Sequence, residues 1–143
     1  MNRVAVLLGL VMTAIACDGG PAGPTPAGSP SNPHTGAFAQ PFTQIYVDEL
    51  VRTRVHAEDP ACVDNPVWRC KYFRITPASD GTLDVVLAFN GGNLDLSLID
   101  SDGHRWWHPV SAPVRAGVTY QITVWEYEFT GLDYDMRASL RPL

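Results

Sequence analysis

Apolar and polar residues alternate along most of the chain from residue 41 onward. Leu83, Val85 and Leu87, for example, are separated by single residues that break the apolar run. Successive side chains of a strand point to opposite faces of a sheet, so this two-residue period predicts strands with one buried face. Strands are predicted on this basis at residues 51–55, 72–75, 83–89, 94–99, 118–124 and 134–140.

Turn residues separate the predicted strands, and no segment has a convincing helical period. Asn90-Gly91-Gly92 follows one strand, and Asp100-Ser101-Asp102-Gly103 follows the next. Asp, Asn and Gly tolerate the positive φ angles that tight turns require. Short strands joined by such turns predict an all-β fold, a single antiparallel, jelly-roll-like β-sandwich over residues 41–143.

The N-terminal segment has the pattern of a signal peptide over residues 1–16. Arg3 supplies a positive charge, and residues 4–16 are apolar. This apolar region of thirteen residues is too short for a membrane-spanning helix, which needs about twenty. Ala14 and Ala16 form a small-x-small cleavage site, which predicts an exported protein.

Cys17 follows the predicted cleavage site directly. Residues 14–17 (AIAC) resemble the bacterial lipobox, with Ala14 where Leu is commonest. The resemblance implies that Cys17 carries a lipid and that this lipid anchors the protein to a membrane of the bacterial cell envelope, periplasmic or surface-exposed. The alternative is cleavage by ordinary signal peptidase at the same bond. Residues 17–40, rich in Pro, Gly, Ala and Ser, predict a flexible linker behind the lipidated cysteine.

The chain contains three cysteines, an odd number for an exported protein. If Cys17 is acylated, Cys62 and Cys70 remain, and an oxidising compartment favours a disulfide between them. The alternatives are two free buried thiols or a zinc site, and the spacing does not suit zinc.

The chain from Cys70 to Leu140 resembles the bacterial pre-peptidase C-terminal domain, a β-sandwich that follows many secreted proteases. The resemblance implies a sandwich fold and a non-catalytic, accessory or binding role. This chain departs from the family at Cys70-Lys71, where the family has an Asp, and residues 58–69 have the character of an insertion. The matching stretches are residues 71–75, 81–87, 93–103, 116–124 and 134–140.

Composition narrows the classes of function further. Apolar residues make up 45 % of the chain and charged residues 17 %, which is ordinary for a globular protein. The net charge of −5 opposes the long-range attraction that phosphate backbones require, so nucleic acid is not an expected partner.

Aromatic residues are the best candidates for a binding site. The period of strand 118–124 places Trp125 and Tyr127 on the face opposite the core, and Trp106-Trp107 follow a turn. Aromatic rings in these positions either form an exposed ligand face or are covered by an edge of the sandwich that folds over them. The predicted ligand-binding residues are Trp106, Trp107, Trp125 and Tyr127.

The sequence gives less support for a catalytic site or a metal site than for a binding site. His104 and His108 are four residues apart, but Pro109 and the strand context argue against a helix, and no Glu lies between them. The sequence contains no nucleophile elbow and no credible Ser/His/Asp set. We therefore expect no enzyme, no cofactor and no metal, although turn carboxylates could furnish calcium ligands. Those carboxylates are Asp95, Asp100, Asp102, Asp133 and Asp135.

Two functional hypotheses follow. The first is a non-catalytic, lipid-anchored envelope protein whose sandwich acts as an accessory or binding module for extracytoplasmic polysaccharide or protein. The second is a structural or interaction subunit of an envelope assembly that takes no small ligand.

Overall fold

The computed structural model describes residues 37–128 and 130–143. Nothing in these two ranges forms a helix long and apolar enough to span a membrane. The described elements are a 3-10 helix η1 (Ala37–Ala39) and the strands β1 (Thr43–Gln44), β2 (Leu50–Arg54), β3 (Arg69–Ile75), β4 (Gly81–Phe89), β5 (Leu94–Ile99), β6 (Arg105–Trp107), β7 (Val110–Val114), β8 (Tyr120–Glu126) and β9 (Asp133–Pro142).

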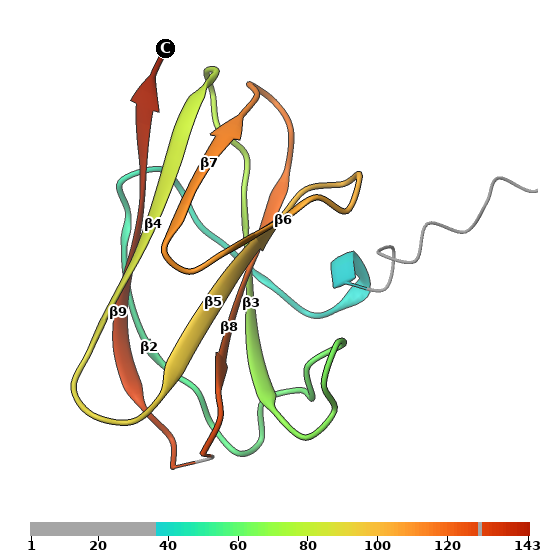
Figure 1. The fold of residues 1–143 in the computed structure, drawn as a ribbon, viewed down its shortest axis with the longest axis vertical. Coiled ribbons are helices and arrows are strands. Elements are labelled where there is room, and N and C mark those ends of the chain that lie inside the picture. The colour runs from blue at the N-terminus through green and yellow to red at the C-terminus, as the bar shows by residue number, and fades with distance from the viewer. Residues whose placement is uncertain (1–36, 129) are drawn as a thin grey trace, which may run out of the picture.

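The strands form two sheets packed face to face, which confirms the predicted β-sandwich (Figure 1). The sheet with the strand order β1-β3-β8-β5-β6 is called the larger sheet, and the sheet with the order β2-β9-β4-β7 is called the smaller sheet. Neighbouring strands are antiparallel except for the two-residue pairing of β1 with β3.

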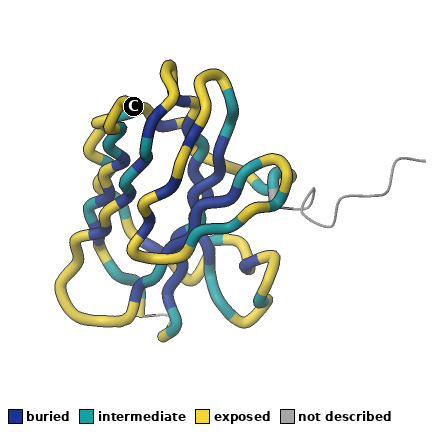
Figure 2. Tube along the Cα trace, turned by 45° about the horizontal axis from the view of Figure 1, so that its top comes forward, coloured by how far each residue is buried: buried dark blue, intermediate teal, exposed yellow. Residues whose placement is uncertain are grey.

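The core lies between the sheets and follows the predicted alternation. In β4, Leu83 and Val85 are buried while Val86 is exposed. In the larger sheet, Ile122 of β8 pairs with Phe73 of β3 and with Leu98 of β5, and all three belong to the same buried core as Leu83 and Val85. Figure 2 shows buried stretches along the strands and exposed stretches mainly in the turns.

Three strands were not among those predicted. β6 has only three residues and β1 only two, so neither is long enough to display a two-residue period. β7 alternates in burial but contains Pro113, and proline within a run argues against a strand. β3 begins at Arg69, inside the segment that has the character of an insertion.

The N-terminal predictions fall largely outside the described residues. This holds for the signal peptide (residues 1–16), for Cys17 and for the linker up to residue 36. The end of the linker and the first residues of the sandwich domain lie against Arg74 of the larger sheet. The guanidinium of Arg74 lies 5.4 Å from the Phe38 ring centroid and 3.7 Å from that of Phe42.

Candidate binding site on the outer face of the larger sheet

The outer face of the larger sheet is buried, although it points away from the core. Cys70 and Tyr72 of β3 and Gln121 and Trp125 of β8 all lie on this face and are buried. Ser97 of β5 is buried on the same face. Something other than the second sheet must therefore cover them.

The cover is the segment of residues 56–68, which we call the disulfide loop. Cys62 in the loop is bonded to Cys70 of β3, with 5.0 Å between their Cα atoms, so the structure contains the disulfide that the cysteine count favours. The Cys62 N–H donates to the Trp68 carbonyl at 3.1 Å, and the Cys70 N–H donates to the Pro60 carbonyl at 2.9 Å. The loop is thus closed on itself and fastened to β3.

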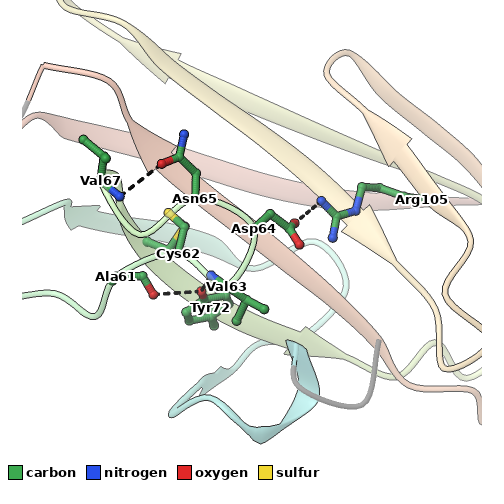
Figure 3. The surroundings of a disulfide bond; sticks show 9 residues. Ala61, Cys62, Val63, Asp64, Asn65, Val67, Tyr72 and Arg105 are labelled. Atoms are coloured by element: carbon green, nitrogen blue, oxygen red, sulfur yellow. Dashed lines mark hydrogen bonds and ion pairs between the residues drawn. A yellow bond between two sulfur atoms is a disulfide. The ribbon is translucent and has the colours of Figure 1, made fainter. Parts of the chain in front are cut away.

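Polar side chains fasten the loop at further points (Figure 3). The Tyr72 hydroxyl accepts a hydrogen bond from the Val63 N–H at 3.2 Å and donates to the Ala61 carbonyl. Burial raises the pKa of Tyr72, so the hydroxyl keeps its proton. Asp64 forms an ion pair with Arg105 of β6, which ties the loop to the far edge of the sheet.

Four aromatic residues, one from the loop and three from the sheet or just after it, lie together, and we call them the aromatic cluster: Trp68, Trp107, Trp125 and Tyr127. Trp68 stacks on Trp125, with ring centroids 6.1 Å apart and ring planes 6° from parallel. Trp107 approaches Trp125 edge-on at 5.9 Å, and Tyr127 approaches Trp68 edge-on at 4.7 Å. Both arrangements are favourable for aromatic pairs.

Trp125 could either be exposed on a ligand face or be covered, and in the structure it is covered. The side chain points to the outer face as the strand period predicts, but it is only 4 % exposed because the disulfide loop packs over it. Tyr127 is half-buried, and its hydroxyl donates to Asp95 at 3.2 Å. Trp107 alone of the predicted rings is strongly exposed, at 56 %.

Trp106 does not join the aromatic cluster. It pairs with Leu98 in the β5–β6 ladder and packs against the main core, while Trp107 pairs with Ser97 and points outward. Adjacent residues of a strand point to opposite faces, so the two tryptophans cannot share a surface. The structure therefore does not bring Trp106 to the same surface as Trp107.

A small pocket of about 40 Å³ lies between the loop and the sheet. Its lining includes the buried residues Gln121 and Trp125 and the exposed residues Val63 and Trp107. Within the described part of the chain, Gln121 Oε1 and Trp125 Nε1 are buried without a hydrogen-bond partner. Buried polar atoms are normally paired. Two other described atoms are also buried without a partner, Arg74 Nε, on the residue that pairs with Gln121 in the β3–β8 ladder, and the Tyr134 hydroxyl.

Sequence reasoning missed three residues of this site. Trp68 lies in a segment without any period, Gln121 is an ordinary polar residue at an outward position, and Arg105 precedes the two tryptophans. One signal for Trp68 was available. It lies between two cysteines eight positions apart, and a bridge between them would hold any large side chain in the loop against β3.

The turn after β5 gathers Asp100, Asp102 and His104, whose potential ligand atoms lie within 4.8 Å of one another. One Asp100 oxygen accepts hydrogen bonds from the backbone N–H groups of Asp102 and His104, at 2.9 and 2.8 Å, and the other contacts His104 Nδ1 at 2.9 Å. Burial raises the pKa of Asp100, but the hydrogen bonds from His104 outweigh it and leave this pKa below its ordinary value. These contacts are those of a stabilised turn, and His108 is not in the group.

No protein-family model matches the chain, and no curated protein matches it. Among solved structures, the pre-peptidase C-terminal domain of collagenase from Bacillus anthracis superposes with a TM-score of 0.52 and 12 % sequence identity, over 70 % of this chain and 98 % of that domain. The chain is similar to this domain in fold. A periplasmic inhibitor of g-type lysozyme from Aeromonas hydrophila gives a TM-score of 0.45 at 11 % identity, over 70 % of this chain and 97 % of the inhibitor. The first likeness agrees with the resemblance carried by the strand motifs.

Proposed function

We propose that this protein is a non-catalytic envelope protein whose β-sandwich binds extracytoplasmic polysaccharide or protein through the aromatic cluster. The observation that carries the proposal is the exposed ring of Trp107 beside a pocket with unpartnered polar atoms. A large ring offers a flat apolar surface, and aromatic residues often carry much of the free energy of binding.

The rigidity around Trp107 supports the same function. The ring packs edge-on against Trp125, and the Arg105 guanidinium lies 5.1 Å from its centroid. Arg105 is in turn held by Asp64 of the disulfide loop. A surface that is already ordered loses little conformational entropy on binding, which favours affinity.

Replacing Trp107 tests this function. We expect Trp107→Ala to leave the melting temperature within a degree or two, since the ring is largely exposed. Retention on insoluble polysaccharides or on envelope protein preparations should fall at least tenfold, as at an interface hot spot. Co-sedimentation of the wild-type and variant chains measures this loss.

Tyr46→Ala is the matched control, because Tyr46 is 69 % exposed and has no part in the aromatic cluster. Its retention should equal that of the wild type. Unchanged retention of Trp107→Ala on every preparation would contradict the binding function and favour a structural subunit of an envelope assembly.

Anchoring by a lipid on Cys17 is part of the proposal and rests on the lipobox resemblance of residues 14–17. Cys17→Ser should abolish incorporation of labelled fatty acid and shift the chain from the membrane fraction to the soluble fraction. If the variant still sediments with membranes in high salt, the anchor is not at Cys17.

A further inference from the structure

The pocket beneath the disulfide loop has the chemistry of a site for a small neutral group. Asp64 and Arg105 are the charged residues of its lining, and they pair with each other. The pocket therefore presents no uncompensated charge to an occupant. Its remaining lining is aromatic, aliphatic or uncharged polar.

The two unpartnered atoms determine which hydrogen-bonding capacity the bound group needs. Trp125 Nε1 is a donor only, and Gln121 Oε1 is an acceptor. A hydroxyl group both donates and accepts, so it can pair with either kind of atom. Leaving both atoms unpaired costs free energy that such a group would recover.

The size of the pocket limits the group further. About 40 Å³ gives room for roughly three water-sized groups, which accommodates a hydroxymethyl group but not a whole sugar ring. The rest of a sugar would lie outside the pocket, next to the exposed ring of Trp107 at the rim.

We propose that this pocket binds the hydroxymethyl group of a neutral hexose, with Gln121 and Trp125 as its hydrogen-bond partners and Trp107 as the surface against which the sugar ring stacks. The inference rests on the proposed function and narrows its ligand to a neutral glycan. A hexose differs from the corresponding pentose by this one group, so the pocket selects hexose over pentose.

Matched methyl glycosides test the selection on the full chain in detergent, followed by tryptophan fluorescence. The pairs are glucoside with xyloside, galactoside with arabinopyranoside, and mannoside with lyxoside, in each of which the second sugar lacks the hydroxymethyl group. We expect at least one hexoside to bind about tenfold tighter than its pentoside. Gln121→Met and Trp125→Phe should each reduce that preference to near unity, while Trp107→Ala should weaken both members of the pair.

The outcomes separate the two proposals. Equal binding of hexoside and pentoside by the wild type, no binding of any glycoside, or a preference that survives in Gln121→Met and Trp125→Phe would each overturn the hydroxymethyl site. The binding function itself would still stand if Trp107→Ala lost retention on a polymer or protein. Circular dichroism establishes that each variant is folded, and the comparison of sugars on the wild-type chain needs no variant.

Discussion

The outer faces of the two sheets have opposite surroundings, although both sheets are built mainly of antiparallel strands. On the smaller sheet, Asp84 and Val86 of β4 and Arg141 of β9 lie in solvent or close to it, and Asp84 pairs with Arg141. On the larger sheet, the corresponding positions of β8 are Gln121 and Trp125, and both are buried.

The difference arises from the disulfide loop, which covers the outer face of the larger sheet. The disulfide loop supplies Trp68 to stack on Trp125, and the bridge from Cys62 to Cys70 holds the loop against β3. The larger sheet consequently has a second, smaller hydrophobic core on its outside, formed by Cys62, Cys70, Tyr72 and Trp125. A β-sandwich can thus carry a pocket on the outside of one sheet, apart from the core between its sheets.

The largest expected effect comes from emptying this second core. Trp125→Ala should lower the free energy of unfolding by about 3–5 kcal/mol, because a buried ring is removed from a packed site. Val86→Ala on the smaller sheet is the control, and with its side chain 61 % exposed it should change stability by less than about 0.5 kcal/mol. Urea unfolding measures both. Similar values for the two variants would show that the loop does not cover Trp125 in solution.

A smaller effect is expected from opening the bridge. Replacing both Cys62 and Cys70 by Ala should cost about 2–3 kcal/mol, because the unfolded chain gains the freedom of a short loop. The main core lies outside the bridged loop, so the variant should keep its strand circular dichroism while iodide quenches Trp125 fluorescence more strongly. Unchanged stability together with unchanged quenching would mean that the loop is held by its hydrogen bonds and the Asp64–Arg105 pair alone.

The smallest effect on stability is expected on the exposed outer face of the smaller sheet. The hydrogen bonds from Arg141 and Ser111 hold the pKa of Asp84 below its ordinary value, so the ionised carboxylate stabilises the folded state. This contribution is present above about pH 4 and is lost as the pH falls through the lowered pKa. Asp84→Asn should therefore melt slightly below the wild type at pH 7 and level with it near pH 2. A difference in melting temperature that is the same at both pH values would exclude the carboxylate as its cause.

The sequence was informative wherever a long strand displays its own period. The alternation in β8 put Trp125 on the outer face correctly, because that orientation depends on a few adjacent residues. What covers the face depends on a contact with Trp68, 57 positions earlier in the chain, and no local pattern encodes such a contact. The separation of Trp106 from Trp107 was missed for another reason, since a three-residue strand is too short to be recognised.

The order of strands in the larger sheet also determines how far the candidate site can reach. Residues 37–44 run into β1 at one edge of this sheet, whereas Trp107 lies in β6 at the opposite edge. Four strand spacings, about 19 Å, separate the two edges. With the proposed anchor at Cys17, the chain would enter the larger sheet at the edge opposite Trp107, and the width of the sheet would separate the exposed ring from that entry point.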